Sequence, residues 1–391
     1  MTNTANADTE IRPFSVTISD AALDDLRNRL NNTRFADTVP GAGWERGVPT
    51  GYLRELTAYW AEKFDWPAVE ARLGTYPQFT TTIDGQNVHF LHIRSPHADA
   101  TPLLLLHGWP GTVLDFNDMI GPLTDPAAHG AGDAPAFHLV IPSLPGHGFS
   151  GPVTETGWND GRIAHAMAEL MRRLGYDGYG VHGGDHGAFI APRIGRDDAE
   201  HVIGLHVNSL VTFPTGDPAD MAALTDADKD RLARMKKFQD DGSAYMQLAG
   251  SRPNTLAQLL ADSPVAQLAW IVEKYQEWTD SAKALPEDAI DRDKILATVT
   301  IYWLTDTAHS VANYYYERFH DVAMFAPQAK GTTPTGIAVF SAGDYAIRPF
   351  AEKTHNVVHW SEFYDGGHFP ALEVPQLLTG DIREFFQTLP R

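Results

Sequence analysis

The sequence contains no cysteine, and this excludes several kinds of chemistry at once. Disulfide bonds, thiolate zinc sites, iron–sulfur clusters and cysteine nucleophiles are all ruled out. Basic residues are also scarce: 30 Lys and Arg stand against 50 Asp and Glu, so the net charge is −20 and the pI is near 5.1. A surface of this sign repels phosphate backbones and anionic lipids, so it disfavours binding to nucleic acids and to membrane surfaces.

No run approaches 18 uninterrupted apolar residues, so the sequence predicts no membrane-spanning helix. The first residues are polar and acidic, which is unlike a secretory signal. We therefore expect a cytoplasmic enzyme or binding protein. Its 391 residues, 43% of them hydrophobic, suffice for two to three domains or for one large α/β domain with insertions.

Short apolar runs bounded by turn residues alternate with helical periodicity along much of the chain. This alternation predicts an α/β fold with a mainly parallel, doubly wound sheet. Strands are expected at 102–106, 137–141, 179–182, 202–207, 337–340 and 356–363, and helices at 161–174 and 377–386. Between residues 213 and 320 the pattern is helical and rich in aromatic residues, as in a helical insertion that covers a sheet.

The first hundred residues have a different pattern. Ser19 precedes an apolar stripe at helical spacing and is a candidate N-cap, and a second helix is expected near residues 50–64. Alternation on both sides of Asp84-Gly85 predicts a hairpin over Phe79–Ile93. We expect five segments: a disordered tail (1–10), an N-terminal region whose end enters the sheet (11–98), a first core segment (99–212), a helical cap (213–325) and a second core segment (326–391).

Gly183-Gly184-Asp185-His186-Gly187 lies between a predicted strand and a predicted helix. Small residues on both sides permit the sharp turn that lifts a nucleophile off the sheet in α/β-hydrolases. The usual serine is replaced here by Asp185, and the chain has no Gly-x-Ser-x-Gly. An aspartate is ionised at neutral pH and needs no base to attack. The alternative is an aspartate that only caps the following helix.

Two further motifs occur in the chain order expected for such a hydrolase. The loop His107–Gly111 follows the first core strand, where backbone N–H groups of Trp109 and His186 would form an oxyanion hole. His368, in a glycine turn before the last helix, occupies the place of the general base, and Asp344 is the carboxylate expected to orient it. Read separately, these are a Gly/Pro turn and a structural histidine.

A metal site is the competing interpretation of one motif. His182, Asp185 and His186 have a spacing that resembles a metal-binding pattern. Such patterns need a helix to bring both histidines onto one face, whereas Gly183-Gly184 ends a strand here. We therefore expect the two histidine rings to diverge, and we expect no metal and no organic cofactor.

These motifs together resemble the microsomal-type epoxide hydrolases of the α/β-hydrolase superfamily, from about residue 11 to residue 386. The N-terminal helices are similar to the epoxide-hydrolase N-terminal region, which packs around the cap. The segments that carry the resemblance are His107–Gly111, Pro142–Gly146, Gly148–Ser150, Leu170-Met171, Leu174–Tyr176, Asp262–Val265, Glu273-Lys274 and Gly366–Phe369.

The resemblance implies roles for individual residues. Asp185 matches the nucleophile, His368 the base, and Tyr245 one of two cap tyrosines that donate a proton to the epoxide oxygen. The second tyrosine matches Tyr315, with Tyr314 and Tyr316 beside it. The acid is matched less closely, and Asp344 is the carboxylate near enough in sequence. The expected substrate pocket contains Trp109, His186, Phe149 and Phe369.

The resemblance implies hydrolysis of an epoxide to a vicinal diol through an ester on Asp185. Where the family usually has tryptophan directly after the nucleophile, this chain has His186, which affects the pocket and hence the substrate preference. A haloalkane dehalogenase with the same nucleophile, or a hydrolase-like binding protein without activity, are the alternatives. The expected partners are a small-molecule epoxide and water, without nucleic acid or membrane, and a homodimer is left open.

Overall fold

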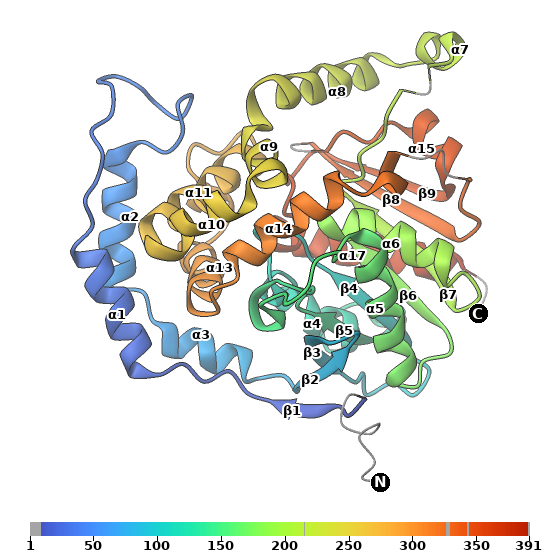
Figure 1. Ribbon diagram of the computed structural model, residues 1–391. Helices are drawn as coiled ribbons and strands as arrows, with labels where there is room; N and C mark the ends of the chain where they lie inside the picture. Colours follow the sequence, from blue (N-terminus) through green and yellow to red (C-terminus); the bar gives the residue numbers. More distant parts are fainter. Residues whose placement is uncertain (1–8, 215, 326–328, 342–343, 390–391) are drawn as a thin grey trace.

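The computed structural model describes residues 9–214, 216–325, 329–341 and 344–389. The expected disordered tail falls almost wholly on residues outside these ranges. One mixed sheet forms the centre, helices cover both of its faces, and a helical cap lies over one end (Figure 1). No helix among the described residues is both long and apolar enough to cross a membrane.

The strands of the described ranges form one sheet in the order β1-β2-β3-β5-β4-β6-β7-β8-β9. From β5 to β9 all neighbours are parallel, whereas β1, β2, β3 and β5 pair antiparallel. The mainly parallel α/β fold is thus confirmed. The bounds are β1 (Arg12–Phe14), β2 (Gln78–Ile83), β3 (Gln86–Ile93), β4 (Thr101–Leu106), β5 (Phe137–Pro142), β6 (Tyr179–Gly183), β7 (Val202–Asn208), β8 (Pro334–Phe340) and β9 (Asn356–Phe363).

Two layers of helices cover the sheet, because the core strands are apolar on both faces. One hydrophobic cluster joins the sheet to α5 (Asp160–Arg173) and α6 (His186–Asp197). A second cluster joins it to α4 (Asn117–Thr124) and α17 (Pro375–Thr388). The shorter helices are α15 (Arg348–Thr354), α16 (Pro370–Glu373), the 3₁₀ helices Val113–Phe116, Gly148–Ser150 and Val322–Phe325, and the π-helical turn Phe238–Gly242.

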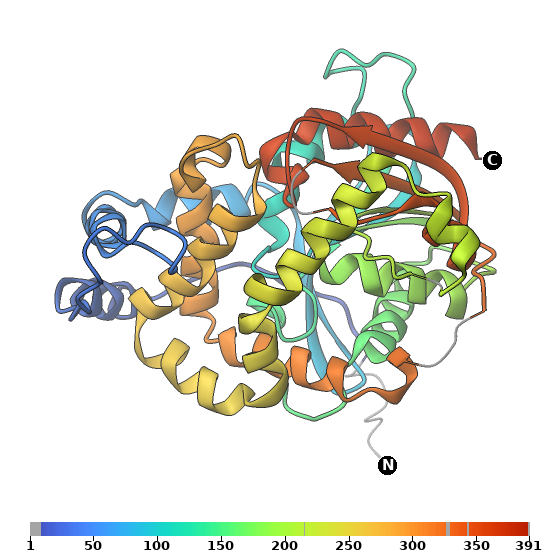
Figure 2. The ribbon, with the colours of Figure 1, turned by 90° about the horizontal axis from the view of Figure 1, so that it is seen from above.

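The cap is inserted between β7 and β8 and consists of helices, as the sequence predicts (Figures 1 and 2). Local sequence sets its helix boundaries: in α11, Pro264 occupies the first turn and the Ser263 hydroxyl accepts the Ala266 N–H. The cap helices are α7 (Pro218–Ala222), α8 (Asp226–Lys237), α9 (Ala244–Ser251), α10 (Pro253–Asp262), α11 (Pro264–Trp278), α12 (Pro286–Ala289), α13 (Arg292–Leu304) and α14 (Ala308–Phe319).

The N-terminal segment connects the sheet to the far side of the cap (Figure 1). Its strand β1 pairs with β2, and α1 (Asp20–Asn31), α2 (Thr50–Glu62) and α3 (Trp66–Leu73) follow. Apolar residues of α1 and α2 share one cluster with the cap helices, and the Trp60 indole donates to the Thr300 hydroxyl over 2.9 Å. The cap is therefore held from two sides, by the core and by this segment.

Candidate active site

Asp185 occupies the sharp turn between β6 and α6. Its φ of 51° and ψ of −116° lie in a region that side chains rarely adopt, so the backbone is strained where the side chain is presented. The turn is closed by the Gly187 N–H, which donates to the Gly184 carbonyl over 2.8 Å. A Cβ on Gly187 would lie within 3.0 Å of Leu106, so only glycine permits this approach of α6 to β4.

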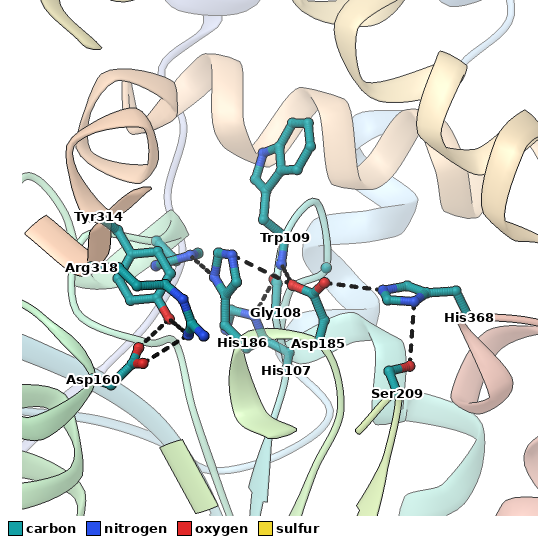
Figure 3. A network of polar contacts seen from close by, with 12 residues as sticks. His107, Gly108, Trp109, Asp160, Asp185, His186, Ser209, Tyr314, Arg318 and His368 are labelled. Carbon is teal, nitrogen blue, oxygen red and sulfur yellow. Dashed lines mark hydrogen bonds and ion pairs between the residues drawn. The ribbon is translucent and has the colours of Figure 1, made fainter. Parts of the chain in front are cut away.

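Both oxygens of the Asp185 carboxylate are engaged (Figure 3). The Trp109 backbone N–H donates to Oδ1 over 2.8 Å, and Nε2 of His368 lies 3.0 Å from Oδ2. Burial alone would raise the pKa of Asp185. The nearby histidines His186 and His368 and the Trp109 N–H oppose that effect and bring this pKa below its ordinary value. The carboxylate is therefore ionised over the whole neutral range.

The negative charge of Asp185 raises the pKa of the neighbouring His368 imidazole. Burial lowers its pKa, but the hydrogen bond and charge of Asp185, with further charge from Asp344 and Glu373, produce a net rise. Its backbone N–H donates to the Trp278 carbonyl of the cap over 2.8 Å, so His368 is anchored to the cap as well as the core. The free site thus favours an ion pair between the carboxylate and the imidazolium.

Asp344 is close to His368 but is not its direct hydrogen-bond partner, which differs from our expectation. Nδ1 of His368 lies 3.3 Å from the Ser209 hydroxyl instead. Asp344 accepts the Phe340 N–H over 2.8 Å; burial raises its pKa to about 6, an effect opposed by that N–H, by His368 and by hydrogen bonding from Ser209. Ser209, and not Asp344, is therefore the direct neighbour of Nδ1 of His368.

Two tyrosines of the cap, Tyr245 and Tyr315, line the same cavity as Asp185. The rings of Tyr245 and Tyr315 approach edge to face, with centroids 5.8 Å apart, and both are buried. Burial and the charge of Asp185 are among the causes that raise both pKa values well above 10, so the hydroxyls stay protonated. Tyr314 points elsewhere: its hydroxyl donates to Asp160 over 2.5 Å. The register that the sequence left uncertain therefore favours Tyr315.

A cavity of about 260 Å³ opens above Asp185. Gln239 and Arg318 line it together with the polar residues already described, and the remainder of its wall is mainly apolar. The wall is formed chiefly by Phe189, Val211, Phe213, Met235, Phe238, Met246, Trp278, Phe319 and Tyr345. Such a cavity suits a compact, mainly apolar molecule whose reacting centre lies against Asp185.

Three expected pocket residues lie elsewhere than predicted. Phe149 packs against Phe14 and His89 on the N-terminal side of the sheet, so its assignment to the pocket was wrong. Trp109 and Phe369 border a smaller cavity beneath Asp185 and are not in the wall of the large one. Their rings instead support it from behind, Trp109 against Tyr245 with centroids 5.7 Å apart.

Comparisons with known proteins agree with this geometry. Family models for the epoxide hydrolase N terminus and for the alpha/beta hydrolase family match residues 11–116 and 103–379. Epoxide hydrolase 1 of Sus scrofa is 32% identical, covering 98% of this chain and 90% of its own. A Stigmatella aurantiaca protein provisionally named an epoxide hydrolase is 42% identical, covering 97% and 85% respectively.

The chain belongs to the epoxide hydrolase family. The epoxide hydrolase of Aspergillus niger superposes with a TM-score of 0.86 at 33% identity, covering 99% of this chain and 98% of that one. The juvenile hormone epoxide hydrolase of Bombyx mori superposes with a TM-score of 0.90 at 28% identity, covering 98% and 96%. The cap and the N-terminal segment are therefore shared with these relatives, because the coverage is nearly complete.

Several residues of this epoxide hydrolase site were not found from the sequence. Ser209 directly follows β7 with a φ of 56°, and its place at the carboxyl end of a core strand was a usable signal. Trp278 ends α11 and lies against the His368 ring, with centroids 5.1 Å apart. Arg318 is buried beside Asp160 over 2.7 Å; nothing in its sequence neighbourhood distinguishes it from a surface arginine.

The histidines of the rejected metal pattern diverge, as the turn predicts. Nδ1 of His182 lies 2.9 Å from His206, while Nδ1 of His186 lies 3.3 Å from His147. Among the described residues, no group of three or more His, Asp or Glu side chains is placed to hold a metal ion.

Proposed function

We propose that this protein hydrolyses epoxides to vicinal diols through a covalent ester on Asp185. The observation that carries the proposal is one arrangement: an ionised carboxylate, held by the Trp109 N–H and His368, beneath the Tyr245 and Tyr315 hydroxyls in a mainly apolar cavity. A strained ring needs a nucleophile on one side and a proton donor on the other, and this arrangement supplies both.

Ring opening is the first half of the reaction. The Trp109 N–H binds Oδ1 of Asp185, so we assign Oδ2, which leaves its contact with Nε2 of His368, as the oxygen that attacks a ring carbon. The bond between that carbon and the epoxide oxygen breaks, and a tyrosine hydroxyl gives its proton to the leaving oxygen. General acid catalysis of this kind contributes about 10²- to 10⁴-fold. The product is a hydroxyalkyl ester of Asp185.

Ester hydrolysis is the second half. Ester formation removes the negative charge that raises the pKa of His368, so the imidazolium gives its proton, through water, to the tyrosinate left by ring opening and the neutral imidazole becomes a base. It takes a proton from water, whose oxygen attacks Cγ of Asp185, and the resulting oxyanion is bound by the Trp109 N–H. As the first residue of α6, His186 has a backbone N–H that the helix leaves free, and we assign it as the second donor. When this intermediate collapses, the departing alkoxide takes the proton of the added hydroxyl, so the diol is released and the Asp185 carboxylate is restored.

The orienting role of the acid is assigned to Asp344 together with Ser209. The Ser209 hydroxyl lies 3.3 Å from Nδ1 of His368, and the charge of the buried Asp344 carboxylate acts on the same imidazole. The contact with Ser209 holds the imidazole so that Nε2 faces Asp185.

The decisive experiment traps the ester. The variant His368→Gln, which lacks the base, is incubated with styrene oxide, and its intact mass is measured and followed by peptide mapping. We expect an adduct with the full mass of the epoxide on the peptide that contains Asp185. The matched control Asp185→Ala should give no adduct under the same conditions.

Other outcomes would contradict the proposal. An alkyl adduct formed only from haloalkanes, with release of halide, would assign the protein as a dehalogenase. Absence of any adduct in His368→Gln, together with an inert wild type toward a panel of epoxides, would indicate a binding protein. An adduct on a residue other than Asp185 would refute the assigned nucleophile.

A further inference from the structure

The side chain of His186 faces the same cavity as the nucleophile and is not used in the reaction described above. Its ring is buried, with 4% of the residue exposed, and Nε2 lies 3.5 Å from Oδ1 of Asp185 (Figure 3). Within the described part of the chain, this nitrogen has no hydrogen-bond partner. A buried polar atom that is left unpaired inside a binding cavity calls for a partner from outside the protein.

The proton positions on the neighbouring ring follow from one carbonyl group. Nδ1 of His147 lies 3.1 Å from the Pro145 carbonyl, which only accepts hydrogen bonds, so Nδ1 of His147 carries the proton. Burial, with the charges of His186 and His107, lowers the pKa of His147 well below 6.5, so the ring is neutral. Its Nε2 therefore has a free lone pair.

This assignment determines the state of the second ring. Nε2 of His147 accepts from Nδ1 of His186 over 3.3 Å, so Nδ1 of His186 carries a proton. Burial lowers the pKa of His186 to about 4; the charge of Asp185 opposes this, and the charges of Arg318, His107 and His368 add to it. At neutral pH the ring is uncharged, and its unprotonated Nε2 directs a lone pair into the cavity.

Two acceptors thus stand side by side, the His186 Nε2 and the Asp185 carboxylate. The ionised Asp185 has no proton to give to His186 Nε2, so the donor to this nitrogen must come from water or substrate. A hydroxyl on the carbon next to the epoxide ring is one bond away from the carbon under attack, close enough to donate to Nε2 while Asp185 reacts. A purely apolar substituent in that place would leave the buried acceptor unpaired.

We propose that His186 Nε2 is a specificity determinant that selects epoxides bearing a hydrogen-bond donor next to the ring, namely 2,3-epoxy alcohols. This proposal rests on the proposed function, since it describes which epoxide the same site prefers. Two aromatic rings pack against His186: the Tyr314 ring with centroids 4.2 Å apart and the Tyr315 ring with centroids 5.2 Å apart. The aromatic contacts hold Nε2 in place before the substrate binds.

The test compares kcat/KM for a matched pair, 3-phenyl-2,3-epoxypropan-1-ol and trans-β-methylstyrene oxide, which lacks only the hydroxyl. We expect the wild type to prefer the alcohol by about 10-fold or more. In His186→Phe the ratio of the two values should fall toward the ratio of their intrinsic reactivities, whatever the variant does to overall rate. Tyr314→Phe, which changes the ring packed on His186 but none of its nitrogen contacts, should keep the wild-type ratio.

A second variant examines the proton assignment without removing the ring. His147→Leu deletes the acceptor of the Nδ1 proton, so the proton of His186 can move to Nε2 and turn the acceptor into a donor. The preference for the alcohol should then be lost. An unchanged ratio in both His186→Phe and His147→Leu would overturn the inference. A wild type that opens styrene oxide without preferring the alcohol would overturn it alone, whereas a wild type inert toward all three epoxides would overturn the proposed function as well.

Discussion

The substitution Gly108→Ala tests the geometry of the nucleophile most directly. An added Cβ at residue 108 would lie 2.6 Å from Cγ of Asp185, and closer still to its Oδ1, where ordinary van der Waals contact begins at 3.4 Å. The three nearest atoms all belong to the Asp185 side chain, so this side chain, with its carboxylate, must move by about 1 Å. Displacement of that size separates Oδ1 from the Trp109 N–H, now 2.8 Å away.

The expected loss follows from that hydrogen bond. Removing one oxyanion donor costs about 10²- to 10³-fold in kcat, or about 3 to 4 kcal/mol. We therefore expect a folded Gly108→Ala variant with kcat on styrene oxide reduced by at least about 100-fold. Chromatography of the diol formed over time measures kcat, and a cooperative thermal unfolding transition shows that the variant is folded.

Gly380→Ala is the matched control. Gly380 lies on the exposed side of α17, and a Cβ there meets no atom within 4 Å. The activity of this variant should equal that of the wild type, and its free energy of unfolding should rise by about 0.5–1 kcal/mol because alanine stabilises the helix relative to glycine. A folded Gly108→Ala variant that keeps about a third or more of wild-type kcat would refute the argument, because the carboxylate would then tolerate displacement.

Three further predictions follow. Tyr245→Phe and Tyr315→Phe should each slow ring opening by about 10²- to 10⁴-fold in single-turnover experiments without lowering the melting temperature by more than a few degrees; normal ring opening in either would exclude it as the proton donor. Ser209→Ala should let the ester accumulate in the steady state, seen by acid quench and mass spectrometry, because hydrolysis needs an oriented His368; an unchanged ester fraction would exclude Ser209 from that role. The free energy of unfolding should fall as the pH drops from 6.5 toward 4. In the folded protein the pKa values of several buried histidines lie below their unfolded values, so the unfolded protein binds more protons in this range. Each such group should lower the free energy of unfolding by about 1.4 kcal/mol per pH unit. The histidines concerned are His89, His107, His147, His182 and His186. Midpoints of urea unfolding at pH 7.5, 6 and 5 measure the loss of stability, and midpoints that do not change with pH would contradict the prediction.

Short-range signals predicted much of this structure. The turn around Asp185 was predictable because its small residues and its place between an apolar strand and a helix are all local. The hairpin at Asp84-Gly85 follows from turn chemistry, and the structure has β2 and β3 on either side of it. The helix α3 was missed, although Asp65 caps it and Pro67 lies in its first turn, two signals that the sequence displays.

Long-range contacts decided what could not be predicted. The orientation of three consecutive tyrosines in α14 depends on Asp160, which is 154 residues away and binds the Tyr314 hydroxyl. The resemblance places Phe149 in the pocket, but its direction is set by packing against Phe14 of β1. The hydroxyl of Ser209 reaches His368 only because β7 ends beside the final glycine turn.

The double attachment of the cap has a consequence for the order in which the chain can fold during synthesis. The Arg29 guanidinium donates to the Asp262 carbonyl, Tyr52 to Glu287 and Trp60 to Thr300, across separations of 233, 235 and 240 residues. At typical rates of synthesis the ribosome needs roughly 10 to 50 s to add that length of chain. The apolar side chains of α1 and α2 are made first and acquire their cap partners only after that delay, so they spend this interval exposed to water on the nascent chain.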